Sequence, residues 1–398
     1  MRRSTEPTSH GNEPGRPVAL GYQPALDGLR ALAALSVVGF HLRVPGFDGG
    51  SLGVDMFFVL SGFLISGLIL REVSARGSLS FSGFYLRRGL RLLPAYFAVV
   101  AVCVAGDVLV VDAGGTLRGA LFSFLYVANW AAALGAGMGT LGHTWSLSVE
   151  EQFYLLWPVL LVGATTAARR WRTSLPAIIA AACALAWAGA AYAVFAADVE
   201  MGMLNNATQF RAAELLTGCT LAAVLLTGDP RRRVWTARSA PLAGVVSLVG
   251  LVALVMVGAP TSTTVLLGTW VGVSVFTTAL IASVRSEGSP AARLLSVGPL
   301  VLVGKMSYGL YLWHYPVLVS IDAAVGLDSL GAKLLAATLT ALVVPASYYW
   351  LETPFLRLKS RVGAQLSSSS TSSAYSPTTN TPLVRSRTHW VPTGWPSR

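Results

Sequence analysis

The chain of 398 residues is divided into apolar stretches, each about as long as a membrane-crossing helix, that are separated by short polar joints. A helix needs about 20 apolar residues to cross the ~30 Å hydrocarbon core of a bilayer. The composition agrees with this pattern, because 54% of the residues are hydrophobic, 12% are charged and the mean hydropathy is +0.60. A single soluble core does not need so much apolar surface. The sequence therefore predicts an all-α fold, a polytopic bundle of transmembrane helices.

Eleven stretches are apolar enough to be candidate crossings. They are residues 24–42, 52–70, 92–111, 117–134, 147–166, 176–197, 211–227, 240–258, 263–283, 299–321 and 330–351. Five joints between or after them are rich in arginine or lysine, and the positive-inside rule places these joints in the cytoplasm. They are residues 71–91, 169–172, 231–238, 285–293 and 357–361. Four further joints are acidic or neutral and are expected outside. They are residues 43–51, 198–210, 259–262 and 322–329.

The segment 117–134 decides how many of these candidates cross the membrane. The two kinds of joint alternate without exception only if residues 112–146 begin and end outside. Arg118, Asn129 and Trp130 also make 117–134 a poor span. We expect a re-entrant or surface-lying segment that is shielded by protein. The expected topology is about ten crossings of the inner (plasma) membrane, with both termini in the cytoplasm.

Two polar tails flank a membrane domain that is expected to occupy residues 22–361. Residues 1–21 are rich in proline and glycine, and residues 362–398 are rich in serine, threonine and proline. Both compositions are typical of disordered segments, and both tails are expected in the cytoplasm. No small-residue cleavage site follows His41, so we expect the first apolar stretch to be retained rather than removed as a signal peptide.

Charge and cysteine content exclude two further classes. A net charge of +11 would indicate a nucleic-acid partner in a soluble protein. Here the arginines cluster beside hydrophobic stretches, so we expect contact with membrane lipid and no nucleic acid. The three cysteines lie in apolar stretches without metal-ligand spacing, so no metal site is expected.

Arg30 and His41 lie in the first apolar stretch, where a lipid-facing position is costly for either side chain. They are eleven positions apart, which at about 100° and 1.5 Å per residue places them on one helix face, roughly 16 Å apart along the axis. Asp27 falls near the same face. The pattern favours a functional site inside the bundle. The alternative is that Arg30 reaches a lipid headgroup while His41 lies in the outer interface.

The start of the third stretch and the start of the second carry further polar candidates. Arg88 and Arg91 share a helix face by their i, i+3 spacing, and paired guanidinium groups suit a phosphate-rich ligand. They could equally be cytoplasmic anchors. Only residues 43–51 separate His41 from the second stretch, so Asp55 could reach the imidazole of His41 and select its tautomer. Asp55 could also be an interfacial acid, and Gly53 could serve only to let two helices pack closely.

Residues 143–158 begin outside and enter the membrane with His143, Glu150 and Glu151. Carboxylates at a helix start interact favourably with the positive end of the helix dipole, and this alone could explain the two glutamates. Adjacent residues point about 100° apart, however, so at least one glutamate is expected to face the interior.

Residues 307–317 place Tyr311 and His314 in the ninth crossing, where a break at Pro316 is possible. An aromatic lining for a substrate tunnel competes there with simple core packing. Glu352, just before Thr353 and Pro354, is expected to mark a helix end rather than an active site.

These strings together resemble the acyltransferase-3 family, the integral-membrane O-acyltransferases that modify bacterial envelope glycans, exopolysaccharides, nodulation factors and macrolides. The resemblance runs from about Tyr22 to Phe355. The family pattern of a basic residue, ten others and a histidine is matched by Arg30 and His41, and its glycine, four residues and phenylalanine by Gly53 and Phe58. Its RxxR motif and the string HTWSLSVEEQFY, residues 143–154, are matched as well.

The resemblance implies acyl-CoA, usually acetyl-CoA, as the donor, with no permanently bound cofactor. Arg88 and Arg91, with Arg30, would hold the nucleotide phosphates at the cytoplasmic side. His41, oriented by Asp55 or Glu150, would act as general base on an acceptor hydroxyl, or would itself carry the acyl group. The residues expected to line the substrate path are Gly53, Phe58, His143, Glu151, Tyr311 and His314.

The resemblance leaves the acceptor open. It is either an envelope glycan or exopolysaccharide, or the sugar of a macrolide-type metabolite. Larger glycan-modifying members often carry an additional esterase-like domain, and the chain after Arg361 is too short for one, which favours the metabolite type. A proton-coupled small-molecule transporter that uses Arg30, His41 and Asp55 as a relay is the alternative function. A transporter of this kind would leave the RxxR pair, Arg88 and Arg91, without a role.

Overall fold

The computed structural model describes residues 22–110, 113–227, 230–258, 262–286 and 288–361. Within these ranges the chain forms helices and no strand, which confirms the all-α prediction. The longer helices are α1 (Pro24–His41), α2 (Gly53–Arg76), α3 (Phe81–Val110), α6 (Thr144–Arg170), α7 (Leu175–Phe195), α9 (Thr208–Thr227), α10 (Pro230–Val257), α11 (Thr263–Val284), α14 (Ser307–Val325) and α15 (Leu330–Ala346). The shorter ones are α4 (Ala113–Phe124), α5 (Ala128–Ala133), α8 (Met201–Asn206), α12 (Pro290–Leu295) and α13 (Gly298–Lys305). The 3₁₀ turns η1 (Gly50–Leu52) and η2 (Gly139–Leu141) and a π-helical turn, Ser347–Glu352, complete the described elements.

The chain is a helical membrane protein. Seven segments of the described residues are long and apolar enough to cross a membrane, and they involve α2, α3, α7, α8 with α9, α10, α11 and α15. Length and hydropathy alone identify seven of the ten predicted crossings. The helices α1, α6 and α14 do not meet these limits, and they are the helices that carry Arg30, Glu150 and His314.

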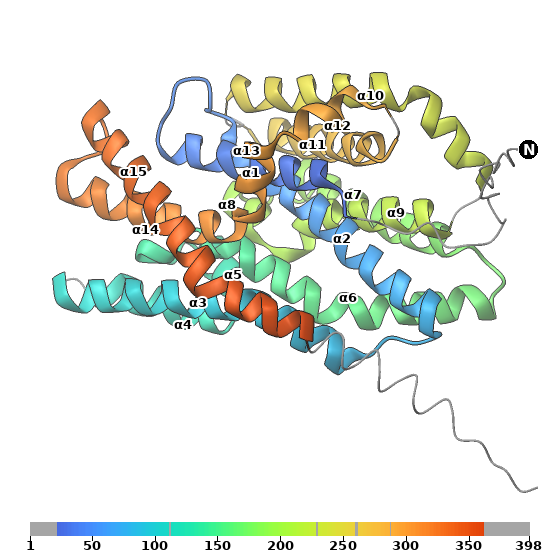
Figure 1. Ribbon diagram of the computed structural model, residues 1–398, viewed down its shortest axis with the longest axis horizontal. Coiled ribbons are helices and arrows are strands. Elements are labelled where there is room, and N and C mark those ends of the chain that lie inside the picture. The colour runs from blue at the N-terminus through green and yellow to red at the C-terminus, as the bar shows by residue number, and fades with distance from the viewer. Residues whose placement is uncertain (1–21, 111–112, 228–229, 259–261, 287, 362–398) are drawn as a thin grey trace, which may run out of the picture.

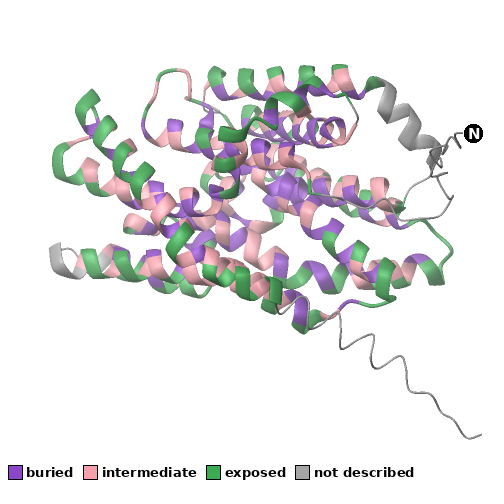
Figure 2. Cartoon of the chain, in the orientation of Figure 1, coloured by how far each residue is buried: buried purple, intermediate pink, exposed green. Residues whose placement is uncertain are grey.

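Apolar side chains on the outside of the bundle indicate its lipid-facing surface. Leu185 on α7, Leu242 on α10 and Leu342 on α15 are each at least 65% exposed. Figure 2 shows exposed residues along the outward faces of α10 and α15, with buried residues where the helices pack together. Such extensive apolar exposure is unfavourable in water and is expected in contact with lipid.

The two kinds of joint lie at opposite ends of the molecule. In Figure 1 the loop between α1 and α2 and the connection between α14 and α15 lie at the left, while α2 and α6 end at the right. Arg43 of the first loop donates to Asp322 at 3.2 Å and to Asp328 at 2.9 Å. Arg71, Arg285 and Lys359, from three of the basic joints, line one cavity at the other end. For these five joints the structure agrees with the prediction that joints of one kind share a side of the bundle.

The segment 117–134 is divided between α4 and α5, which have 12 and 6 residues. A 12-residue helix is about 18 Å long, well short of the ~30 Å hydrocarbon core. Neither helix can cross alone, in agreement with the expectation that this segment does not span the membrane.

The predicted ninth crossing, 299–321, is not one continuous helix. It breaks at Met306, between α13 and α14, whereas Pro316 lies inside α14 without ending it. The break lets α13 dock on α1, where Gly304 packs directly against the backbone carbonyl of Asp27. A side chain at position 304 would overlap that carbonyl group. The predicted break at Pro316 is therefore wrong, because packing against α1 determines where the helix is interrupted.

Glycines also bring α2 and α9 into close contact. A Cβ atom at Gly62 would overlap the carbonyl oxygen of Leu215, and one at Gly218 would overlap that of Val59. Small residues allow this close approach between membrane helices. The predicted disordered tails, 1–21 and 362–398, lie outside the described residues.

The expected topology can be checked by labelling single cysteines in a variant whose three native cysteines are replaced by alanine. Gly137→Cys and Asp328→Cys should react with a membrane-impermeant maleimide added to intact cells, whereas Arg170→Cys should react only after the cells are opened. All three positions are exposed, so failure to react reports the side of the membrane rather than burial. Labelling of Arg170→Cys in intact cells would contradict the orientation, and labelling of Gly137→Cys only in opened cells would restore 117–134 as a crossing.

Candidate active site

Four cavities follow one another along α1. The basic cavity is lined by Arg30, Arg71, Arg91, Arg285, Lys305 and Lys359, among others. The central cavity shares Arg30, Arg91 and Tyr308 with it. The histidine cavity shares Val54 and Tyr311 with the central cavity, and the loop cavity, beside residues 43–48, shares Phe40, His41 and Tyr315 with the histidine cavity. The shared lining residues show that the four cavities are neighbours in a row.

Arg30 and His41 lie in different parts of this series, as their spacing on one helix face predicts. Arg30 lines the basic and central cavities, and its Nε donates to Ser307 Oγ at 3.1 Å. His41 lines the histidine and loop cavities. Both side chains therefore face the bundle interior, and neither is a lipid-facing anchor.

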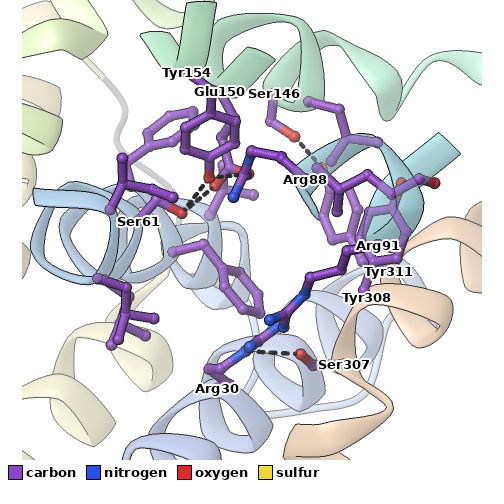
Figure 3. A pocket seen from close by; sticks show the side chains of 18 of the residues that line it. Arg30, Ser61, Arg88, Arg91, Ser146, Glu150, Tyr154, Ser307, Tyr308 and Tyr311 are labelled. Carbon is purple, nitrogen blue, oxygen red and sulfur yellow. Dashed lines mark hydrogen bonds between the residues drawn. The ribbon is translucent and has the colours of Figure 1, made fainter. Parts of the chain in front are cut away.

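The central cavity holds three arginines (Figure 3). Arg88 and Arg91 both line it, as the i, i+3 spacing predicts, and Arg91 points toward Arg30. The guanidinium carbon of Arg88 lies 3.1 Å from the centroid of the Tyr154 ring. Because guanidinium groups that face each other repel, an anion between Arg30 and Arg91 would be favourable.

Glu150 also lies in the central cavity, where it forms a hydrogen-bond network with Ser61 and Tyr154. Ser61 Oγ donates to Glu150 Oε1 at 2.8 Å, and Tyr154 Oη lies 2.9 Å from Glu150 Oε2 and 2.8 Å from Ser61 Oγ. The prediction that Glu150 orients His41 is therefore wrong. Glu150 is seven residues after His143 on α6, which places it about 10 Å further along the helix axis, away from the histidine cavity.

His41 is oriented by a backbone carbonyl group. Its Nδ1 lies 2.9 Å from the carbonyl oxygen of Val37, one turn earlier on α1. A carbonyl oxygen can only accept a hydrogen bond, so Nδ1 of neutral His41 carries the hydrogen and Nε2 keeps its lone pair. His314 Nε2 lies 3.3 Å from the same Nδ1 atom. The arrangement leaves Nε2 of His41 able to accept a proton.

Two further histidines from distant helices lie beside His41. The ring centroids of His41 and His314 are 5.2 Å apart, and those of His143 and His314 are 5.8 Å apart. The ring centroid of Tyr315 lies 5.1 Å from that of His41 and 5.1 Å from that of His143. Tyr311 Oη donates to the carbonyl oxygen of His143 at 3.0 Å and lies 2.5 Å from Ser146 Oγ. The sequence motifs containing these histidines thus converge on one place.

Asp55 does not contact His41. It accepts a hydrogen bond from Arg211 Nη2, and the same nitrogen lies 3.6 Å from Glu214 Oε2. All three residues are at least 97% buried. The prediction that Asp55 selects the tautomer of His41 is therefore wrong, because a buried carboxylate is stabilised far more by a guanidinium cation than by a neutral imidazole.

Arg211 and Glu214 were missed by the sequence analysis. They lie on α9, at the start of a stretch that was assigned as a crossing on its apolar residues. Ionisable residues inside a membrane span are rare and usually functional, which is the same signal that selected Arg30 and His41. Applied to α9, that signal would have found both residues.

The remaining predicted lining residues divide into two groups. Phe58, His143 and Tyr311 line the central or histidine cavity as expected. Gly53, Glu151 and His314 do not line the described cavities.

Each of these three residues lies where packing or pairing accounts for it. A Cβ atom at Gly53 would overlap the carbonyl oxygen of Ala33, so this glycine permits close packing of α1 and α2. Glu151 Oε1 lies 4.0 Å from Arg88 Nη2. His314 is fully buried next to His41.

Glu352 is buried in the π-helical turn and lines the basic cavity. Its Oε1 has no hydrogen-bond partner among the described residues. The interpretation of Glu352 as a simple helix end is therefore incomplete, because π-helical turns frequently occur at functional sites. Within the described residues no group of three or more histidine, cysteine or acidic side chains could hold a metal ion.

Comparisons with known proteins were made against families, curated proteins and solved structures. The family model described as an acyltransferase domain matches residues 23–350. The chain is 30% identical over 352 residues to the peptidoglycan O-acetyltransferase OatA of Listeria monocytogenes, which covers 84% of this chain and 56% of the relative. It is 30% identical over 351 residues to the O-acetyltransferase OatA of Staphylococcus aureus, which covers 84% of this chain and 57% of the relative. The chain thus spans little more than half the length of these relatives, and no solved structure matches it.

The buried charge cluster formed by Asp55, Arg211 and Glu214 should control stability. Arg211→Met leaves two carboxylates buried without a cation and should cost about 3–5 kcal/mol of unfolding free energy. Adding Asp55→Asn and Glu214→Gln to this variant should recover part of the loss. Thermal unfolding of the purified protein in detergent measures both effects, and Arg118→Met, at an exposed position on α4, is the matched control. A melting temperature that Arg211→Met leaves unchanged would contradict the role of the cluster.

Proposed function

Because this chain belongs to the acyltransferase-3 family of membrane O-acyltransferases, we propose that it transfers a short acyl group, usually acetyl, from acyl-CoA to a hydroxyl group of a cell-envelope glycan. Acyl-CoA is then a co-substrate rather than a permanently bound cofactor. One structural observation carries the proposal. Neighbouring cavities lie in a row from an arginine-rich region at one end of α1 to His41 at the other, an arrangement that suits a donor and an acceptor that approach one reaction centre from opposite sides.

The basic cavity supports a nucleotide-binding role. Its lining brings together cations from α1, α2, α3, the end of α11, α13 and the chain after α15, and Arg30 and Arg91 also line the central cavity. Guanidinium groups recognise phosphate oxygens through charge and paired hydrogen bonds. The phosphates of acyl-CoA would lie among these cations. Its narrow pantetheine arm would pass through the central cavity toward Tyr311, where the histidine cavity begins.

His41 supplies the base for the transfer. Nε2 of His41 takes the proton of the acceptor hydroxyl as its oxygen attacks the thioester carbonyl carbon. The new C–O bond forms, the C–S bond breaks, and the CoA thiolate leaves with the proton that Nε2 returns. In the alternative route Nε2 attacks the thioester first, and the acyl group rests on His41 before the acceptor oxygen displaces it. Labelled acetyl groups that remain on the protein in the absence of acceptor would identify the second route.

The relatives favour a glycan over a macrolide as acceptor. The Listeria monocytogenes relative is named a peptidoglycan O-acetyltransferase and the Staphylococcus aureus relative an O-acetyltransferase. Neither name mentions a macrolide. The transporter alternative has no support from these relatives. It also leaves Arg88 and Arg91 without a role, although both line the central cavity. With the basic end in the cytoplasm, the acceptor would enter from the outer side of the plasma membrane.

His41→Ala should lower acetyl transfer by about 10²–10⁴-fold, because the base is lost while the cavities remain. The assay follows radiolabelled acetyl groups from acetyl-CoA to peptidoglycan fragments, and to a macrolide for comparison, in membranes that contain the protein. His389→Ala, another histidine substitution but outside residues 22–361, is the matched control and should retain activity. Full activity of His41→Ala would reject the proposed base.

Arg91→Ala should raise the apparent KM for acetyl-CoA at least tenfold, because a phosphate contact is lost. The effect should disappear with S-acetyl-pantetheine, a donor that lacks the phosphates. Arg87→Ala is the matched control, since Arg87 pairs with Glu72 at 2.8 Å and does not line the described cavities. An equal rise of KM for both donors in Arg91→Ala would argue against phosphate binding.

A further inference from the structure

We propose that the histidine cavity is a binding site for neutral sugar hydroxyls, in which Arg211 and Asp55 hold the acceptor beside His41. The site rests on the proposed function, because it assigns the acceptor half of that reaction. The cavity lies between α1, α2, α6, α8, α9, α11 and α14. Arg211, Asp55, His143 and Asn205 contribute its polar lining together with His41.

Arg211 has donors that the protein does not use. Only 1% of the residue is exposed, and neither Nε nor Nη1 has a hydrogen-bond partner among the described residues. Buried donors are nearly always satisfied in folded proteins, and leaving one unpaired costs about 1–3 kcal/mol. Since Arg211 lines a cavity, the missing acceptors are most simply supplied by a ligand in that cavity.

His143, which directly precedes α6, points to the same conclusion. It is 4% exposed, lines the same cavity, and neither ring nitrogen has a hydrogen-bond partner among the described residues. A neutral imidazole offers one donor and one acceptor. A sugar hydroxyl is also both a donor and an acceptor, so it can satisfy an imidazole and a guanidinium group at once.

The aromatic residues around Arg211 keep its guanidinium group in place. Its Cζ atom lies 4.5 Å from the ring centroid of Trp270, 5.1 Å from that of Phe58 and 5.7 Å from that of Trp145. Cation–π contacts of this kind are stronger in a desolvated site. Trp145 and Trp270 also line the cavity, and aromatic side chains suit the carbon-bound hydrogens of a sugar ring.

The charge of the cluster selects against an anionic ligand. Asp55 accepts a hydrogen bond from Arg211 and Glu214 lies 3.6 Å from the same nitrogen, so the positive charge of Arg211 is already compensated. A carboxylate or phosphate in the cavity would lose its hydration without gaining an unpaired cation. A neutral polyhydroxyl ligand has no such cost, and it can donate to Asp55 and accept from Arg211. The geometry therefore favours neutral sugars over uronates.

The position of the cavity connects this binding site to the reaction centre. His41, Tyr311 and Tyr315 line it together with Arg211, and Tyr311 also lines the central cavity. A hydroxyl group held here lies next to His41 Nε2 and at the junction where the acyl group arrives. The same cavity therefore explains how one hydroxyl among several is presented to the base.

Equilibrium dialysis with tritiated N,N′-diacetylchitobiose, using the full-length protein in detergent, measures sugar binding without any transfer. Arg211→Lys keeps the charge but loses the planar fork of donors, so it should weaken binding at least tenfold. Asn205→Leu, at a half-buried cavity position, should weaken binding several-fold without disturbing the charge cluster. Arg118→Lys, at an exposed arginine, should bind as the wild type does.

A matched disaccharide in which glucuronate replaces one N-acetylglucosamine should bind at least tenfold more weakly than N,N′-diacetylchitobiose. The apparent KM for acetyl-CoA should be the same in the wild type and in both cavity variants, which shows that the donor side remains folded. If Arg211→Lys fails that check, Asn205→Leu decides the test alone.

Unchanged sugar binding in the cavity variants, or preferred binding of the uronate, would overturn the proposal. Failure of the proposed function gives a different result. Sugar binding that depends on Arg211 without any acetyl transfer would reject the acyltransferase reaction and leave the binding site intact. Acetyl transfer with an unchanged KM for the acceptor in both variants would reject this site and leave the reaction intact.

Discussion

Ionisable side chains inside a membrane-spanning bundle lose the hydration that stabilises them in water, and the structure depends on the contacts that replace it. Arg211 pairs with Asp55 and Glu214 and is surrounded by aromatic rings. Glu150 bonds to Ser61 and Tyr154, and Arg88 covers the Tyr154 ring. These contacts join α2 to α9, α2 to α6, and α3 to α6. The polar residues that make a site possible are thus also the residues that hold its helices together.

Close packing of small residues provides the second half of the architecture. Gly62 and Gly218 bring the backbones of α2 and α9 together, and Gly304 brings α13 onto α1. Gly62 lies seven residues after Asp55 on α2, and Gly218 lies seven residues after Arg211 on α9, so each pair shares nearly the same helix face. The contact between α2 and α9 therefore combines close backbone packing at one level with the Asp55–Arg211 pair at another. The histidine cavity lies at the level of that pair.

The site is divided by charge along α1. Arginine and lysine side chains gather around Arg30, whereas neutral imidazoles and the charge cluster of Arg211 surround the other end. This arrangement agrees with the proposed reaction between an anionic donor and a neutral acceptor, because the basic end favours an anionic partner. His41 lies at the end away from the arginines, with its Nδ1 2.9 Å from the carbonyl oxygen of Val37, and in the neutral tautomer that donates from Nδ1 its Nε2 is unprotonated.

The sequence by itself determined the helical membrane class, the helices near their observed positions and the shared face of Arg30 and His41. These features follow from hydrophobic length and from the 3.6-residue helical repeat, which are local properties of the chain. It could not determine which partner a buried charge takes. Asp55 meets Arg211, 156 positions away, rather than the nearby His41, and Glu150 meets Ser61 and Tyr154 rather than His41. The interruption of the 299–321 helix at Met306 likewise depends on packing against α1. Only the tertiary structure decided the partners of the buried charges and the position of the helix break. The reason is that the desolvation cost of a buried group depends on every helix that surrounds it.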